Sequence, residues 1–309
     1  MSTGGPTQPR PTRNDRRDAA REKARALREE QKKRDRRTKL LIQGGVVVVI
    51  LAVAALVVGL VVQNSQPEGP GPRNMASDGI LMVGGENGIE AVETSAVAEG
   101  GEPTPTEPDE SGTVANIVTY IDYLCPYCGQ FENTNNETMR TMVESGAATL
   151  EVHPIAILTN KSAGTQFSLR AANAAACVAE TSPEAFFDFN ALMFENQPEE
   201  LSTGLTNDEI KEIASQAGAS GSVDACIDET RFKGWVQDAT ERALTGPIPN
   251  SELESITGTP TVLVNGKQYV GSLEDTAEFQ AFVLQAAGES YSESNGTPTP
   301  TPTPTPAAG

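Results

Sequence analysis

Hydrophobic and polar positions divide the chain into segments of different kinds. Residues 40–62 form an apolar run of 23 residues without a charged side chain, in which only Gln43 is plainly polar. As a helix with about 1.5 Å rise per residue, this run spans roughly 34 Å, enough to cross the hydrocarbon core of a bilayer. We therefore predict a transmembrane helix at 40–62. A cleaved signal peptide is the alternative, but no small-residue cleavage site follows the run.

Periodic patterns of the kind found in globular domains occupy residues 113–288. They predict two strands separated by a helix, then a block of several helices, then a hairpin turning at Asn265-Gly266 and a closing helix. In chain order these segments are 113–124, 128 to about 145, 147–158, about 164–245, 259–272 and 276–288. Within the helical block, three plausible N-caps are Ser182, Thr206 and Ser222. The order favours an α/β fold with an α-helical insertion at about 164–245.

Segments rich in Gly, Pro, Ser and Thr surround this block. Residues 63–112 are expected to form a linker, with a small β-hairpin at 79–92 around a Gly-rich turn. Residues 289–309 end in a Thr-Pro repeat, which prefers an extended polyproline II conformation and cannot bury a core. We predict a disordered tail there, which acts as a spacer or a glycosylated stalk.

The net charge of −19 combines two regions of opposite sign. Residues 1–39 contain 14 Lys and Arg against 6 Asp and Glu, whereas residues 40–309 contain 9 against 36. An acidic body repels phosphate, so nucleic acid is not an expected partner. The basic flank of the apolar run places residues 1–39 in the cytoplasm by the positive-inside rule. Residues 63–309 are therefore expected outside the cell membrane.

The candidate chemistry begins where the first predicted strand gives way to a helix, at Cys125-Pro126-Tyr127-Cys128. A C-x-x-C pair also occurs in zinc sites, but a zinc site needs further ligands. The other cysteines, Cys177 and Cys226, are isolated, and His153 is the single histidine. We therefore predict neither a metal nor another cofactor, and interpret His153 as structural.

The segments YIDYLCPYCGQF and GTPTVLVNG, separated by a helical block, resemble the thioredoxin-fold DsbA-type thiol–disulfide oxidoreductases. The resemblance covers about 113–288 and is greatest to the membrane-anchored, extracytoplasmic proteins of actinobacteria. It implies an enzyme that forms or rearranges disulfides in exported proteins with Cys thiols. It also implies a membrane redox partner that returns the active-site pair to its starting redox state. Thr259-Pro260 is similar to the family's cis-proline loop, which lies beside the active-site pair and binds substrate backbone.

The placement of the motif agrees with this chemistry. A thiolate attacks disulfides, and the free N–H groups and dipole at a helix N-terminus stabilise an anion. Cys125 is therefore the expected nucleophile, and Cys128, one helical turn later, is the expected buried resolving thiol. Pro126 suits the first helical turn because its missing N–H is not needed there. An inert disulfide at a turn is the alternative interpretation.

Tyr127 departs from the usual DsbA dipeptide, Pro-His, whose histidine helps to stabilise the thiolate. Isomerase and reductase roles therefore stay open beside oxidation, as does a non-catalytic thioredoxin-fold binding module of the cell envelope. If Cys125 pairs with Cys128, then Cys177 and Cys226 have only each other, and we expect a structural disulfide in an oxidising compartment. Two buried free thiols are the alternative. Asp122 could relay a proton, although a solvated or capping acid is the expectation.

Overall fold

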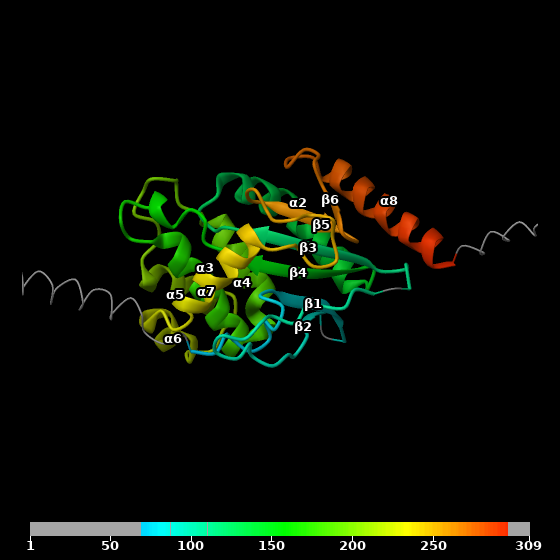
Figure 1. Cartoon of the computed structure of the whole chain (residues 1–309). Helices are drawn as coiled ribbons and strands as arrows, with labels where there is room; N and C mark the ends of the chain where they lie inside the picture. Colours follow the sequence, from blue (N-terminus) through cyan, green and yellow to red (C-terminus); the bar gives the residue numbers. More distant parts are fainter. Residues whose placement is uncertain (1–68, 87, 110, 296–309) are drawn as a thin grey trace, which may run out of the picture. The chain divides into compact units, whose positions relative to one another are not determined.

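The computed structural model describes residues 69–295, except 87 and 110, and one six-stranded sheet organises them (Figure 1). The strands lie in the order β2-β1-β4-β3-β5-β6. The central strands β3 and β4 are parallel, and every other neighbouring pair is antiparallel. The strands are β1 (Ile80–Gly85), β2 (Gly88–Ala91), β3 (Ala115–Ile121), β4 (Ala148–Pro154), β5 (Thr261–Val264) and β6 (Lys267–Gln268).

Two long helices pack together against one face of the sheet. Helix α2 (Pro126–Glu144) contacts β1 and β4, and α8 (Thr276–Asn295) contacts β3 and β5. Phe131 of α2 and Phe279 of α8 meet edge to face, with 5.1 Å between their ring centres. Helix α2 ends in front of Gly146, whose φ of 72° is the left-handed conformation that glycine adopts without steric cost after a helix.

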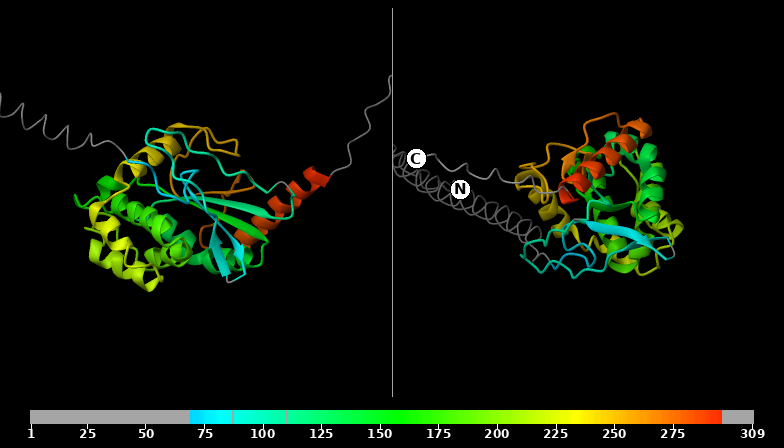
Figure 2. Two further views of the ribbon diagram at one scale, coloured as in Figure 1. Left: turned by 90° about the horizontal axis from the view of Figure 1, so that it is seen from below. Right: turned by 90° about the vertical axis from the view of Figure 1, so that its right-hand side faces the viewer.

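The predicted helical insertion lies between β4 and β5, and its helices gather at one end of the sheet (Figures 1 and 2). This arrangement confirms the thioredoxin-like α/β fold with a helical insertion. Two short 3₁₀ turns, Thr159–Lys161 and Pro183–Ala185, connect its elements. The helices are α3 (Phe167–Thr181), α4 (Phe186–Glu195), α5 (Asn207–Gln216), α6 (Val223–Glu229) and α7 (Lys233–Thr245).

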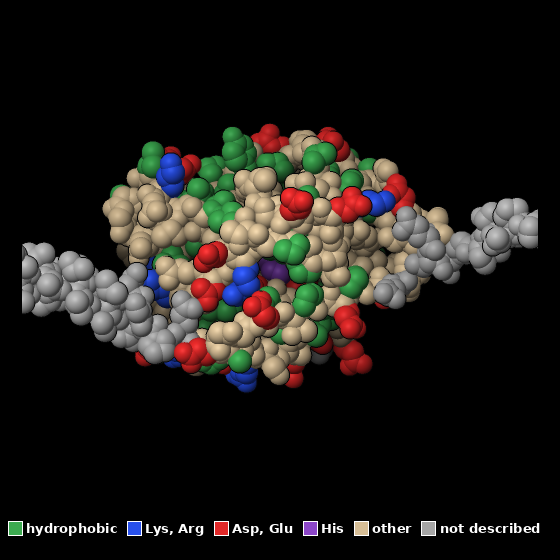
Figure 3. Space-filling model, in the orientation of Figure 1, with side chains coloured by type: hydrophobic (Ala, Val, Ile, Leu, Met, Phe, Trp, Pro, Cys, Tyr) green, Lys and Arg blue, Asp and Glu red, His purple; other side chains and the backbone are tan. Residues whose placement is uncertain are grey.

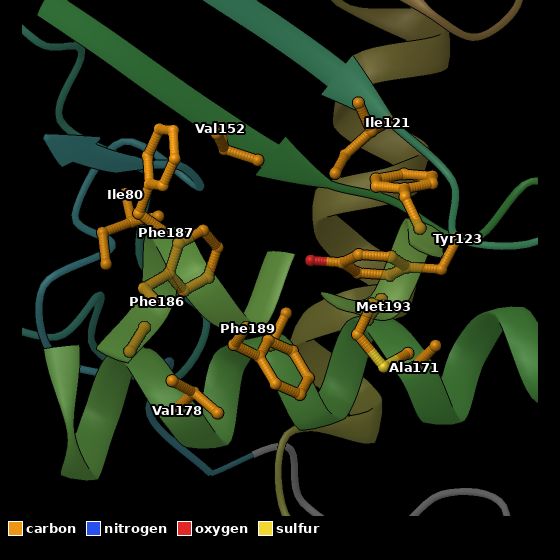
Figure 4. Close-up of a cluster of buried hydrophobic side chains, with 14 of the residues drawn as sticks. Ile80, Ile121, Tyr123, Val152, Ala171, Val178, Phe186, Phe187, Phe189 and Met193 are labelled. Carbon is orange, nitrogen blue, oxygen red and sulfur yellow. The ribbon is translucent and has the colours of Figure 1, made fainter. Parts of the chain in front are cut away.

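The insertion shares one core with the sheet. Figure 4 shows Ile121 and Val152, at the ends of β3 and β4, on one side of a buried cluster, and Phe189 of α4 on the other. The ring of Tyr123 points into this cluster and lies 5.1 Å from Phe194, centre to centre. Burying an Ile, Val or Phe side chain stabilises a fold by about 1.5–3 kcal/mol. Removal of the insertion would therefore expose the active-site end of the sheet to water.

A disulfide connects two helices of the insertion. Cys177 of α3 and Cys226 of α6 are bonded, with 5.8 Å between their Cα atoms, and both residues are fully buried. The bond closes a loop with a sequence separation of 49. It therefore connects the start of the insertion to α6 across α4 and α5.

Of the three predicted N-caps, one makes a side-chain capping hydrogen bond. Thr206 opens α5 with a capping box, in which its hydroxyl accepts from the Glu209 N–H at 3.2 Å. Ser182 and Ser222 occupy the predicted N-cap positions of the 3₁₀ turn Pro183–Ala185 and of α6, but neither side chain accepts a capping hydrogen bond. The Ser182 hydroxyl instead accepts from the backbone N–H of Ser220 at 2.9 Å, which joins two loops of the insertion.

Two predicted helix boundaries also change. The last part of the predicted helical block, 222–245, forms two helices, because Thr230 adopts a left-handed φ of 48° and α7 begins at Lys233. Helix α8 continues to Asn295 rather than ending at 288, where the tail was predicted to start. Its added turn is held by a tertiary contact, since Asn265 Nδ2 donates to Ser290 Oγ at 2.9 Å.

Residues 69–112 do not form the expected linker, because they are packed on the domain. Strands β1 and β2 form the predicted hairpin, and β1 pairs with β4 and thereby extends the central sheet. Just before β1, Asp78 accepts hydrogen bonds from Trp235 Nε1 at 3.1 Å and from Arg242 Nε at 2.7 Å. Composition suggested a linker because Gly and Pro are abundant, but main-chain pairing and a largely buried ion pair attach this segment.

The predicted membrane anchor concerns residues outside the described part of the chain. No helix within the described ranges is both long and apolar enough to cross a bilayer. The apolar run 40–62, the basic segment 1–39 and the end of the tail from 296 lie outside these ranges.

Loss of the disulfide should destabilise the protein and leave the other cysteines unchanged. In the chain-entropy model, closing a loop of this length is worth about 4 kcal/mol. We expect the double variant Cys177→Ala/Cys226→Ala to lose about this free energy of unfolding in urea, with an unchanged alkylation rate at Cys125. A loss below about 1 kcal/mol would show that packing alone holds the insertion.

Candidate active site

The C-x-x-C motif occupies the junction between the central strand β3 and helix α2. Cys125 is the N-cap residue of α2, with an extended backbone of φ −74° and ψ 116°, and Pro126 follows at the first helical position. Cys125 is 5 % exposed and Cys128 is fully buried, and both are free thiols. The Tyr127 side chain between them is 61 % exposed. The motif therefore keeps both cysteines buried, Cys128 completely and Cys125 with a small exposed fraction at the N-terminus of α2.

The surroundings of Cys125 favour its thiolate. The pKa of Cys125 is lowered to about 6, chiefly by a hydrogen bond from the Cys128 thiol, although burial opposes the shift. The Thr259 side chain and the backbone N–H groups of Cys128 and Tyr127 lower the pKa further. These backbone donors are the unsatisfied N–H groups of the first turn of α2. Near neutral pH, Cys125 is therefore largely a nucleophilic thiolate.

Cys128 has the opposite character. Burial raises its pKa well above the ordinary range, and the hydrogen bond to Cys125 and the charge of Cys125 raise it further. The backbone N–H of Asp122 lies 3.5 Å from its sulfur and donates to it. Cys128 thus stays protonated next to the thiolate and stabilises it by donating a hydrogen bond.

The loop before β5 lies against the reactive sulfur. The Thr259–Pro260 peptide bond is cis, and the Cys125 sulfur lies 3.2 Å from the carbonyl oxygen of Thr259, to which it donates in its protonated form. The Thr259 hydroxyl is buried and has no hydrogen-bond partner within the described ranges, yet it lowers the pKa of both cysteines. The hydroxyl is therefore available to donate a hydrogen bond to a sulfur when that sulfur is charged.

Asp122 is neither solvated nor a helix cap, so that expectation is wrong. Its carboxylate is fully buried and accepts from Leu124 N at 2.9 Å, Leu158 N at 2.8 Å and Ser168 Oγ at 2.7 Å. Burial raises its pKa, and these three donors oppose that shift. Asp122 therefore fastens the active-site turn to the loop after β4 and to helix α3.

Sequence reasoning did not find a buried network one turn below Cys128. Glu132 is 2 % exposed, and burial raises its pKa to about 7. Its Oε2 accepts from Asn190 Nδ2 at 3.2 Å, and Asn190 Oδ1 accepts from the Tyr123 hydroxyl at 2.9 Å. Its Oε1 has no hydrogen-bond partner among the described residues. The i, i+4 spacing from Cys128 to Glu132 was the available signal, since it places both on one helix face.

Gln197 is a second residue that sequence reasoning missed. It follows the end of α4, and its side-chain amide donates to the carbonyl of Tyr123 at 3.0 Å and to that of Cys125 at 2.9 Å. Its position in a polar loop gave no signal of this role. Two elements remote in sequence, the α4 end and the cis-proline loop, therefore meet at Cys125.

His153 belongs to another part of the domain. It stacks on Tyr120 with 4.4 Å between ring centres, and its Nε2 lies 3.4 Å from a Glu151 carboxylate oxygen. Tyr120 belongs to a small core separate from the one that contains the two cysteines. His153 also lines a cavity of about 520 Å³, and Figure 3 shows the imidazole at the bottom of this hollow. The described residues contain no cluster of three or more His, Cys, Asp or Glu that could hold a metal ion.

Comparisons with known proteins identify the family of the chain. A family model described as thioredoxin matches residues 110–284, more than half of the chain. Reduced DsbA from Mycobacterium tuberculosis is 28 % identical, with coverage of 71 % of this chain and 100 % of that protein and a TM-score of 0.51. The oxidised form of that protein is also 28 % identical. The match covers 70 % of this chain and 100 % of that protein, with a TM-score of 0.50. DsbG from the same organism is 29 % identical over 59 % of this chain and 86 % of that one, with a TM-score of 0.47. No curated protein sequence matches.

The stability of the reduced protein relative to the oxidised protein should fall as the pH decreases from about 9 to about 6. Folding lowers the pKa of Cys125 from its ordinary value of 9.0 to about 6, so the unfolded chain takes up a proton that the folded chain does not bind. The stabilisation is complete above pH 9 and is lost as the pH falls through 6. Urea unfolding of both forms across this range measures it, and a constant difference would contradict a Cys125 thiolate at neutral pH.

Glu132→Gln should stabilise the oxidised protein above a pH of about 7. Folding raises the pKa of Glu132 from 4.5 to about 7, so wild-type stability decreases as the pH rises through this window. Glutamine retains an acceptor for Asn190 and carries no charge. We expect the variant to lose this decrease, whereas Glu195→Gln, at an exposed position of α4, should keep it. Parallel pH profiles for wild type and Glu132→Gln would contradict a carboxyl that ionises inside the fold.

Proposed function

The chain belongs to the thioredoxin family and is a DsbA-like thiol–disulfide oxidoreductase, and we propose that it forms disulfides in exported proteins from a membrane anchor. The observation that supports this role most directly is the unequal pair of thiols in the motif. The pKa of Cys125 is lowered to about 6, while that of Cys128 is raised. Such a pair favours the reduced enzyme and makes its disulfide reactive toward client thiols.

The proposed reaction starts from the oxidised Cys125–Cys128 bond. A client thiolate attacks Cys125 Sγ, which is the more exposed sulfur, and forms a mixed disulfide while Cys128 leaves and takes up a proton. A second client thiolate then attacks the client sulfur of the mixed disulfide and expels Cys125 as a thiolate. The client loses two electrons and gains a disulfide, and the enzyme ends as a dithiol. A membrane redox partner must then accept these two electrons.

The difference between the two thiol pKa values also indicates whether the enzyme oxidises or reduces its clients. Among proteins of this fold, the pKa of the nucleophilic cysteine ranges from about 7 in thioredoxin, a reductant, to about 3.5 in DsbA, a strong oxidant. A pKa of about 6 for Cys125 lies on the oxidising side of thioredoxin. Tyr127 is largely exposed and adds no positive charge beside the sulfur, which agrees with a potential less extreme than that of DsbA. Oxidation is therefore the direction that we propose.

Client binding would use the loop that carries the cis peptide. Thr259 presents its carbonyl 3.2 Å from the Cys125 sulfur. A client segment in extended conformation can pair its main chain with this edge while its cysteine meets Cys125, as in other forms of strand addition. Recognition through the main chain suits an enzyme that accepts many different clients.

Two features support a location outside the cell membrane. The apolar run 40–62 has a basic flank on its N-terminal side, which favours a cytoplasmic N-terminus. The bonded Cys177–Cys226 pair is of the kind that persists in oxidising compartments. Acidic side chains are spread over the face in Figure 3 with few Lys and Arg, so the domain has little attraction for nucleic acid. We propose a single-pass membrane protein with residues 63–309 extracytoplasmic.

Substitution of each cysteine in intact cells tests this function. Cys128→Ser should accumulate mixed disulfides with exported proteins, because the Cys125 thiolate attacks a client disulfide and expels one client thiolate, and no Cys128 thiol is present to displace the client again. Cys125→Ser is the matched control and should trap none. The adducts should occur in the membrane fraction and be digested by protease added outside the cells. Equal trapping by both variants, or adducts with cytoplasmic proteins only, would contradict the proposal.

A further inference from the structure

A side chain of the insertion reaches the main chain of the active-site turn. The Nε2 group of Gln197 donates to the carbonyls of Tyr123 and Cys125, at 3.0 and 2.9 Å. Its two amide hydrogens are thereby used on the peptide groups that precede Leu124 and follow Cys125. Gln197 is half-buried and lies just after α4, so an element outside the motif determines how these two peptide groups are oriented.

We propose that Gln197 is a positioning residue that holds Cys125 in the geometry of its thiolate form. This proposal rests on the proposed function of the Cys125–Cys128 pair. The Cys125 carbonyl is also the first acceptor of α2, since it receives the N–H of Gly129 at 3.2 Å. The Cys125 carbonyl therefore accepts one hydrogen bond from within α2, from Gly129, and one from outside the helix, from Gln197. Without the hydrogen bond from Gln197, the peptide group after Cys125 can rotate at the N-terminus of α2.

The orientation of this peptide group matters for the charge on the sulfur. Backbone N–H groups of Tyr127 and Cys128 stabilise the Cys125 thiolate only while the first turn of α2 keeps its geometry. In addition, a donor on each carbonyl offsets part of the negative charge that the carbonyl oxygens place near the thiolate. Both effects act on the reduced enzyme more than on the oxidised one, because only the reduced enzyme carries the charged sulfur.

Gly129 supplies the space that Gln197 needs. A Cβ atom at this position would overlap Oε1 of Gln197 and lie 3.1 Å from its Cδ. Because those atoms end a flexible side chain, a larger residue would displace the amide and leave the helix intact. We infer that the glycine directly after the second cysteine is required by Gln197 and not by the backbone of α2. Alanine is also the better helix former by about 1 kcal/mol.

The test measures the thiolate directly on the full-length protein. Gln197→Ala should raise the pKa of Cys125 enough to slow alkylation by roughly tenfold at a pH below that pKa, which is the loss of about one hydrogen bond. A tenfold shift in the redox equilibrium corresponds to about 30 mV, and the potential should become more negative. Thiolate absorbance against pH and equilibration with glutathione provide the two readouts.

Gly129→Ala offers an independent way to remove the same contact. It should shift the pKa and the potential in the same direction with Gln197 still present, and the double variant should shift them no further than either single variant. Asn133→Ala is the matched control. It removes another amide-to-carbonyl bond between α2 and the end of α4, from Asn133 Nδ2 to Phe194 O at 3.4 Å, and should leave both readouts at the wild-type values.

A purely structural role for Gln197 gives a different result. In that case Gln197→Ala would lower the free energy of unfolding equally in the oxidised and reduced forms, and the pKa and potential would not move. This outcome would overturn the proposal, as would an unchanged pKa in Gly129→Ala. Failure of the proposed function is separate, because it would appear as wild-type protein that does not oxidise a reduced peptide, whatever the variants do to the pKa.

Discussion

The two active-site sulfurs lie one helical turn apart and have pKa values shifted in opposite directions. The rest of the domain holds the geometry on which this difference depends. Cys125 is the N-cap residue of α2, where unsatisfied N–H groups stabilise a charge, and keeps a small exposed fraction, whereas Cys128 is fully buried. The hydrogen bond between them lowers the pKa of the first and raises that of the second. Together with the burial of Cys128 and the backbone donors at Cys125, this contact determines that Cys125 attacks and Cys128 stays protonated. It depends on a rigid junction between β3, in the middle of the sheet, and α2.

The helical insertion contributes to that rigidity and is part of the active site. Three of its side chains reach the turn from different places: Ser168 binds the Asp122 carboxylate, Asn190 binds the Tyr123 hydroxyl, and Gln197 binds two main-chain carbonyls. These contacts are short only if α3 and α4 keep their positions. The disulfide from α3 to α6 and the shared aromatic core supply this support.

Two buried acids near the motif show how hydrogen bonding decides the role of a carboxyl group. Asp122 receives three donors, which offset much of the cost of burying its charge, so it serves as a structural tie. Glu132 receives one donor and keeps one oxygen without a partner among the described residues. Its pKa of about 7 follows from that shortage, and it places a carboxyl that gains and loses a proton near neutral pH one turn from Cys128.

Local patterns in the sequence determined much of this fold. The β-branched runs of β3 and β5, the Asn265-Gly266 turn and the capping box of α5 depend on residues close together in the chain. Their stability comes from neighbouring positions, so their periodicity can be read directly. The C-x-x-C pair at the end of a strand and the Thr-Pro before the hairpin likewise identified the chemistry and the element order. The apolar run at 40–62 predicts the membrane anchor by the same kind of local signal.

Only the tertiary structure decided which distant groups share the site. The ion pair that attaches the segment before β1 joins residues 164 positions apart, and Gln197 reaches Tyr123 across 74 positions. Such contacts leave no periodic signal in the sequence, because the two partners are far apart in the chain. Their strength depends on packing, which excludes water and lowers the dielectric constant around the hydrogen bond. The burial of Asp122 and the raised pKa of Glu132 have the same origin. The sequence alone determined the reactive pair and its scaffold, whereas packing decided what tunes that pair.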